Sequence, residues 1–113
     1  MAGQPGFTGI VREPRVPSPR PPLLVLLHGF GAEEHDLLPL AEALDPRLCV
    51  VSLRAPYEAE PMGHAWYALD WRTSPPTPRL DEAEQSCAAL AAFLPDLVAR
   101  TGADPARVFL FGF

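Results

Sequence analysis

The chain has 113 residues, of which 48% are hydrophobic, and it carries nine Arg, no Lys, fourteen acidic residues and a net charge of −5. The hydrophobic content suffices for a packed core and argues against intrinsic disorder outside the ends. The acidic balance argues against binding to nucleic acid or anionic membranes, and the longest apolar run is too short to span a bilayer. Because no signal sequence opens the chain, a cytoplasmic protein without stable membrane association is expected.

The N-terminal segment, residues 1–22, is predicted to lie outside the core. Residues 7–12 have the pattern of a strand at the edge of a sheet. Residues 14–22 hold five prolines, which lack the N–H that a sheet interior requires and favour an extended connector. We therefore expect a short edge strand followed by a stiff surface link.

A strand, a loop and a helix follow, and they define the centre of the predicted fold. The aliphatic run Leu23–Leu27 indicates a strand buried on both faces. Residues 29–31, Gly-Phe-Gly, form a loop that can turn sharply and approach a ligand closely. Apolar spacing predicts an amphipathic helix over 36–44, capped by Asp36, and then a strand over 48–53. This order predicts an α/β class with a parallel sheet and a site at its carboxyl edge.

The stretch at 54–79 has no helical or strand periodicity and contains five prolines. Loops of this length within a compact domain are usually functional or disordered. The stretch is also rich in large apolar side chains that are costly to leave in water, namely Tyr57, Met62, Trp66, Tyr67 and Trp71. We therefore expect this loop to fold back over another part of the molecule.

The last third of the chain predicts one long helix and a third core strand. The helix begins near Asp81, whose charge suits a helix N-terminus, and Pro95 is expected to bend it or to mark its last part. Its apolar stripe includes Cys87, so this thiol and Cys49 in the second strand are both expected to be buried and inert. The third strand is predicted over 108–113.

Several segments, taken in order, carry a resemblance to a known family. They are Leu27-His28-Gly29-Phe30-Gly31, Glu34-x-Asp36-Leu37, Arg54-Ala55-Pro56, Trp66-Tyr67 and Asp104-Pro105-x-Arg107-Val108-Phe109-Leu110-x-Gly112-Phe113. The chain resembles the small α/β-hydrolase serine esterases of the phospholipase/carboxylesterase and acyl-protein thioesterase type. The resemblance implies an α/β-hydrolase with a mostly parallel central sheet and flanking helices, of which residues 1–113 are the N-terminal part. It also implies hydrolysis of carboxylic esters, or of thioesters, through an acyl-enzyme intermediate.

The resemblance implies where the catalytic groups lie. In this family a strand ending in Gly-Phe is followed at once by the nucleophilic serine, and here Gly112-Phe113 match these two residues. The serine is expected directly after Phe113, and the Asp and His of the triad later still, so this segment alone is expected to be inactive. One donor of the oxyanion hole is implied at the backbone N–H of Phe30, in a loop shaped by Gly29 and Gly31.

The family match also implies how substrate is bound. Trp66 and Tyr67 could line an acyl pocket, although packing of the core under the loop explains them equally well. His64 could contact substrate, or it could be a surface residue. No cofactor and no metal are expected. The expected partner is a small-molecule ester, and the resemblance is also compatible with a homodimer.

Polar residues near the glycine loop have simpler explanations than catalysis. His28, at the end of the strand, is interpreted as holding the loop by hydrogen bonds. Glu33, Glu34 and Asp36 are attributed to the favourable field at a helix N-terminus rather than to a metal site or an acid pair. Arg54 is expected to pair with a carboxylate.

Two other functions compete with ester hydrolysis. A dinucleotide fingerprint would need a third glycine at position 34, which is Glu34, and the Walker pattern needs a Lys that the chain lacks. A non-catalytic α/β-hydrolase-like binding protein would keep this scaffold without the nucleophile, whereas Ser-x-Gly after Phe113 would favour the enzyme.

The resemblance also bears on where the sequence stops. The strand at 108–113 is central in the family's sheet, and a domain that ended at Phe113 would leave this strand as an exposed apolar edge. We therefore expect either a segment of a longer chain, interrupted at a covalently modified serine, or a truncated product.

Overall fold

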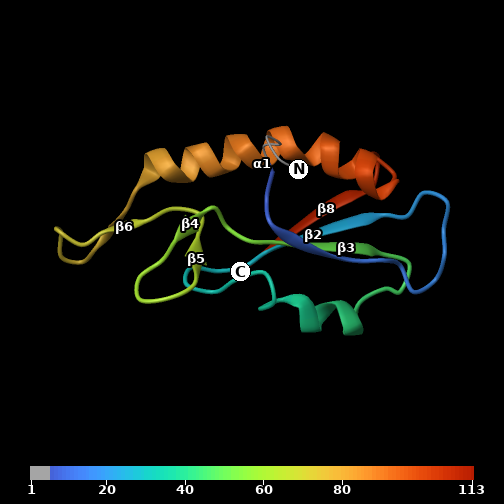
Figure 1. The fold of residues 1–113 in the computed structure, drawn as a ribbon, viewed down its shortest axis with the longest axis horizontal. Coiled ribbons are helices and arrows are strands. Elements are labelled where there is room, and N and C mark those ends of the chain that lie inside the picture. The colour runs from blue at the N-terminus through green and yellow to red at the C-terminus, as the bar shows by residue number, and fades with distance from the viewer. Residues whose placement is uncertain (1–5) are drawn as a thin grey trace.

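The computed structural model describes residues 6–113, so the first five residues of the expected N-terminal segment lie outside the described residues. Four strands form one sheet in the order β1-β3-β2-β8 (Figure 1). They are β1 (Gly9–Arg12), β2 (Leu23–Leu27), β3 (Cys49–Leu53) and β8 (Val108–Gly112). β2 pairs in parallel with both β3 and β8, whereas β1 pairs antiparallel with β3. The predicted α/β class, with a mostly parallel sheet and an N-terminal edge strand, is confirmed.

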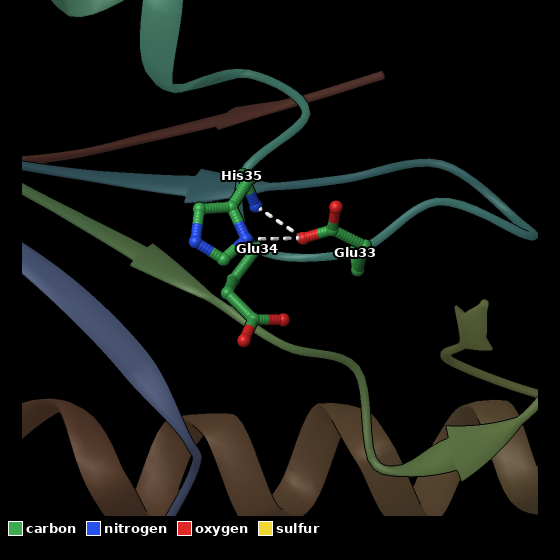
Figure 2. A group of neighbouring side chains, drawn as sticks. All are labelled: Glu33, Glu34 and His35. Carbon is green, nitrogen blue, oxygen red and sulfur yellow. Dashed lines mark hydrogen bonds and ion pairs between the residues drawn. The ribbon is translucent and has the colours of Figure 1, made fainter.

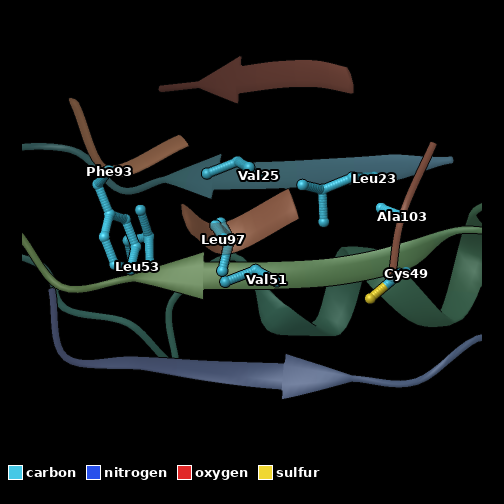
Figure 3. Packing of buried hydrophobic residues seen from close by; sticks show 8 residues of the cluster. All are labelled: Leu23, Val25, Cys49, Val51, Leu53, Phe93, Leu97 and Ala103. Carbon is cyan, nitrogen blue, oxygen red and sulfur yellow. The ribbon is translucent and has the colours of Figure 1, made fainter. Parts of the chain in front are cut away.

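The sheet is packed on both faces, which explains why β2 is aliphatic at every position. One face is covered by the helix α1 (Leu80–Thr101), and the buried residues of this layer are Leu23, Val25, Cys49, Val51, Leu53, Phe93, Leu97 and Ala103 (Figure 3). The other face is covered by the segment after β2, and the buried residues there are Leu24, Leu26, Leu37, Ala41 and Val50. Alternate residues of a strand point to opposite faces, so a doubly covered strand requires an unbroken aliphatic run.

The segment after β2 differs from the amphipathic helix predicted over 36–44. It contains a short 3-10 helix, η1 (Leu38–Ala43), whose N-cap is Leu37 without a side-chain hydrogen bond. Asp36 does not cap a helix, so this prediction was wrong. Pro39 lies at the start of η1, and the two buried residues of η1 are three positions apart. Residues three apart eclipse each other in a 3-10 helix, so this short segment buries its apolar positions without a full α-helical turn.

The long helix α1 covers the predicted range. It continues through Pro95 to Thr101, and Gly102 ends it in the left-handed conformation, with φ 72° and its N–H bonded to the carbonyl oxygen of Val98. No helix in residues 6–113 combines the length and the apolar character that crossing a membrane requires.

The buried face of α1 differs from the predicted stripe, because Cys87 is exposed. Ser86 is buried instead, and its hydroxyl donates to the carbonyl oxygen of Trp66 at 2.6 Å. Phe93, two helical turns after Ser86, is buried on the same face. Cys87 directly follows Ser86 and is therefore rotated by about 100° toward solvent. Cys49 is buried as predicted, and burial raises the pKa of its thiol.

The loop at 54–79 folds back over the core only in part, since Met62 and Trp71 are 71% and 64% exposed, and it contains two small antiparallel ribbons. These are β4 (Tyr57–Glu58) with β5 (His64–Ala65), and β6 (Leu69–Asp70) with β7 (Thr77–Pro78). Ala65 is fully buried, and Trp66 packs against the core layer under α1. The ribbons are two residues long on each side, too short to leave a periodic signal in the sequence.

β8 lies at one edge of the described sheet and pairs with β2 through all five of its residues. Phe109, Leu110 and Phe111 are exposed, at 52%, 52% and 42%. The central position expected for this strand concerns residues beyond Phe113 and stays a prediction.

Replacing Leu97 by Ala tests the corrected face of α1. Leu97 is 4% exposed and belongs to the core layer under the helix, so the shortened side chain leaves a cavity. We expect the free energy of unfolding in urea to fall by about 2–5 kcal/mol. Cys87→Ala on the same helix is the matched control and should change it by less than about 0.5 kcal/mol. Equal losses in the two variants would contradict the assignment of the buried face.

Candidate active site

The carboxyl ends of β2 and β8 meet at one edge of the sheet. Parallel pairing aligns Leu27 with Gly112, and the N–H of Phe113 donates to the carbonyl oxygen of Leu27 at 3.2 Å. A Cβ placed on Gly29 would lie 2.9 Å from the carbonyl oxygen of Phe113. The loop after β2 therefore touches the end of β8 backbone to backbone, which favours glycine at position 29. Figure 1 shows the C-terminal end of the chain beside this loop.

His28 holds this loop with both ring nitrogens, as the sequence predicted. Its ring is buried, and Nε2 accepts the N–H of Ala55 at 3.0 Å. The ring proton must therefore be on Nδ1, which donates to the carbonyl oxygen of Gly29 at 2.8 Å. The N–H of Ala32 donates to the same oxygen at 3.1 Å. Two donors thus fix the carbonyl group of Gly29.

The direction of the Phe30 N–H follows from these two bonds. The carbonyl of Gly29 and the N–H of Phe30 belong to one planar trans peptide, in which the two groups point in opposite directions. The Phe30 N–H therefore points away from the donors of His28 and Ala32. Within residues 6–113 it has no hydrogen-bond acceptor. The loop thus presents one backbone donor whose direction is set by its neighbours.

The two aromatic residues predicted to bind substrate occupy different places. The indole N–H of Trp66 donates to the carbonyl oxygen of His28 at 2.7 Å, and the two rings lie 5.7 Å apart. Because Trp66 also packs against the core, it supports the loop from the core side. The ring of Tyr67 lies 6.5 Å from the ring of Phe30, which is 42% exposed. A role of either residue in binding an acyl group stays a prediction.

An ion pair with a buried carboxylate holds the far end of the loop. The guanidinium of Arg54 donates to both carboxylate oxygens of Glu34, at 2.8 and 2.7 Å, which confirms that Arg54 pairs with a carboxylate. These hydrogen bonds lower the pKa of Glu34 to about 2. The Ser52 hydroxyl donates to the backbone carbonyl oxygen of Glu34 at 2.6 Å. The side chain and the backbone of one loop residue are thus both tied to β3 and the residue that follows it.

The helix-dipole explanation of Glu33, Glu34 and Asp36 is wrong, because η1 has no acidic residue in its first turn. Glu33 instead accepts hydrogen bonds from the backbone N–H and the ring of His35, at 2.6 and 2.8 Å, and these lower its pKa. Figure 2 shows this pair with the Glu34 carboxylate turned away from it. Glu33, Glu34 and His35 lie close enough to share an ion, but Arg54 occupies the oxygens of Glu34. Nothing in this group indicates a metal site.

A contact that the sequence did not predict lies behind the glycine loop. Gly63, between β4 and β5, has φ 79°, and a Cβ there would overlap the carbonyl oxygen of Gly31. The carbonyl oxygen of His64 accepts the N–H of Gly31 at 2.9 Å, and the N–H of His64 donates to the carbonyl oxygen of Ala32 at 2.8 Å. A single glycine in a long aperiodic loop carries no local signal of such a partner.

The side chain of His64 lies apart from the glycine loop that its backbone contacts. It lines a cavity of about 810 Å³ together with Phe7, Arg54 and Phe93, and none of residues 29–31 lines this cavity. Its Nδ1 atom is buried and has no hydrogen-bond partner in residues 6–113. The predicted contact between His64 and substrate stays a prediction.

Comparison with known proteins identifies the architecture. No family model matches the chain. Among solved structures, the esterase PE8 superposes with a TM-score of 0.80 and 32% sequence identity, over 95% of this chain and 52% of that one. The fold is that of the α/β-hydrolase esterases. The carboxylesterases of Mesorhizobium loti and Bacillus cereus are also similar, with TM-scores of 0.78 and 0.76 and 24% identity each, over 100% and 95% of this chain and 51% and 48% of theirs.

The α/β-hydrolase match confirms the resemblance drawn from the sequence. The chain spans about half the length of these esterases. In open α/β sheets, ligands bind outside the carboxyl ends of the strands. This is the edge at which Gly29 and Phe113 are in contact.

Glu34→Gln tests the ion pair that anchors this α/β-hydrolase loop. Because the folded-state pKa of Glu34 is lowered from 4.5 to about 2, its stabilising contribution is complete above pH 4.5 and is lost as the pH falls toward 2. At neutral pH we expect the variant to lose about 1–3 kcal/mol of unfolding free energy, since charge-assisted hydrogen bonds are weakened. Urea unfolding at several pH values should show this deficit shrinking between pH 4.5 and 2.

Asp45→Asn is the control for a surface pair. Asp45 is bonded to Arg47, which lowers its pKa to about 2 as well, but both side chains are exposed. We expect this variant to lose much less stability at neutral pH, because water screens exposed pairs. A deficit in Glu34→Gln that does not change with pH would contradict the role of the ionised carboxylate.

Proposed function

We propose that this chain acts in a protein that hydrolyses carboxylic esters, or thioesters, through an acyl-enzyme intermediate. In this proposal the chain supplies the N–H of Phe30 as one donor of the oxyanion hole. It also supplies β8, the strand that leads to a nucleophilic serine directly after Phe113. The likeness to the esterase PE8 supports ester hydrolysis as the class of reaction.

The observation that carries the proposal is the contact between the glycine loop and the end of β8. A Cβ on Gly29 would lie 2.9 Å from the carbonyl oxygen of Phe113, so the two backbones are adjacent. A nucleophile on the next residue would therefore begin close to the loop that presents the Phe30 N–H. Losing one such donor typically lowers the rate by about 10²–10³, or roughly 2.7–4 kcal/mol of barrier.

The chemistry assigned to this chain is electrostatic. The serine oxygen would attack the carbonyl carbon while its proton passes to the triad histidine, and the carbonyl oxygen would become an oxyanion. The N–H of Phe30 and the N–H that follows the nucleophile would donate to that oxygen. The alcohol, or the thiol of a thioester, would leave with the proton from the histidine, and water would then release the acid by the same sequence of steps. The triad itself is proposed to lie after Phe113.

The substrate is proposed to be a small-molecule ester. The half-exposed ring of Phe30 and the nearby ring of Tyr67 offer an apolar surface beside the proposed donor, which supports an apolar acyl group. Trp66 and His64 complete the set of proposed substrate-binding residues. A cytoplasmic location and a homodimer stay predictions.

Labelling with a fluorophosphonate probe tests the proposal. The serine oxygen of an active serine hydrolase displaces fluoride and keeps the phosphonyl group, so the labelled residue can be found by mass spectrometry of the peptides. We expect the label on the residue directly after Phe113 in the full-length protein. Replacing that residue by Ala is the control and should abolish labelling. An unlabelled protein would favour a non-catalytic α/β-hydrolase-like binding protein, and a label at another residue would contradict the proposed position of the nucleophile.

A further inference from the structure

We propose that Gly63 is a positioning residue of the ester-hydrolysing site. The turn between β4 and β5 lies against the glycine loop, and Gly63 is the residue that permits this approach. The inference rests on the proposed function, because it concerns how the Phe30 N–H is kept in place.

The first observation is the space available at Gly63. The residue has φ 79°, in the left-handed region that favours glycine. A Cβ there would overlap the carbonyl oxygen of Gly31 and would lie 2.9 Å from the carbonyl oxygen of Ala32. These neighbours are backbone atoms, which cannot turn aside as the end of a flexible side chain can. Any side chain at position 63 must therefore displace the loop or the turn.

The second observation is the pair of backbone hydrogen bonds beside this contact. The N–H of Gly31 donates to the carbonyl oxygen of His64 at 2.9 Å, and the N–H of His64 donates to the carbonyl oxygen of Ala32 at 2.8 Å. The turn itself is closed by the N–H of Ala59, which donates to the carbonyl oxygen of Gly63 at 2.9 Å.

The turn is anchored in the body of the protein, so it can serve as a fixed support. Ala59, at one end of the turn, is buried, and Ala65, just past the other, is fully buried. β4 and β5 pair on both sides of the turn, with Tyr57 opposite Ala65 and Glu58 opposite His64. The glycine loop is thus bonded to a ribbon that is itself held by the core.

Ala32 transmits this support to the proposed donor. Its carbonyl oxygen is bonded to the N–H of His64, and its own N–H is bonded to the carbonyl oxygen of Gly29. That carbonyl shares a planar peptide with the Phe30 N–H, so a shift of Ala32 reorients the donor. A misplacement of about 1 Å at a catalytic group can lower a rate by about 10².

Gly63→Ala, compared with Gly102→Ala, tests the proposal in the full-length protein. Gly102 has a similar backbone conformation, φ 72°, but a Cβ there would have no heavy atom within 4 Å. Both variants therefore carry the left-handed strain of a non-glycine residue, and only the first also displaces the loop. We expect Gly63→Ala to lower kcat for ester hydrolysis by about 10²-fold with little change in KM, because the lost interaction is made in the transition state. Gly102→Ala should keep kcat within about twofold of the unaltered protein.

Three results would contradict either the positioning role of Gly63 or the proposed ester hydrolysis. Equal kcat values in Gly63→Ala and Gly102→Ala, with ester hydrolysis by the unaltered protein, would overturn the role of Gly63 alone. Absence of hydrolysis in the unaltered protein would contradict the proposed function. If Gly63→Ala does not fold, hydrogen exchange in the unaltered protein decides. The amides of Gly31 and His64 should then show similar protection factors that are higher than that of Phe30, and unprotected Gly31 and His64 amides would overturn the proposal.

Discussion

One carbonyl oxygen, that of Gly29, carries the constraint on which the candidate site depends. It accepts the ring N–H of His28 and the backbone N–H of Ala32, at 2.8 and 3.1 Å. Because the peptide between Gly29 and Phe30 is planar and trans, these bonds also set the direction of the Phe30 N–H. A donor that is oriented before substrate arrives needs no reorganisation during the reaction, and this is why oxyanion holes built from backbone amides are effective.

The rest of the described fold supports that peptide. The parallel register of β2 and β8 brings Gly29 against Phe113. Because Gly29 has no side chain, its backbone can contact the backbone of Phe113. Ala55 and Trp66, both in the loop at 54–79, hold His28 through its ring and its backbone carbonyl oxygen. β2 is covered on both faces, so the strand that leads into the loop cannot shift without disturbing two close-packed layers.

The sequence predicts the parts of this arrangement that depend on local patterns and residue chemistry. The unbroken aliphatic run Leu23–Leu27 is typical of a doubly buried strand, and the roles of His28 and Arg54 follow because polar groups beside such a strand need hydrogen-bond partners. Contacts between segments that are far apart in the sequence leave no local pattern of residues from which they could be predicted. The approach of Gly63 to the glycine loop depends on the tertiary fold. Cys87 is exposed because Ser86 and Phe93 lie on the buried face of α1, which is rotated from the face that the apolar spacing predicts.

A crystal structure of the complete protein with a phosphonate covalently bound to the nucleophile would test the central claim most directly. The phosphonyl oxygen stands for the oxyanion of the tetrahedral intermediate. The account predicts that this oxygen lies about 2.7–3.1 Å from the nitrogen of Phe30, while the carbonyl oxygen of Gly29 stays bonded to His28. A separation too long for a hydrogen bond, or a peptide turned so that the Gly29 carbonyl faces the phosphonate, would contradict it.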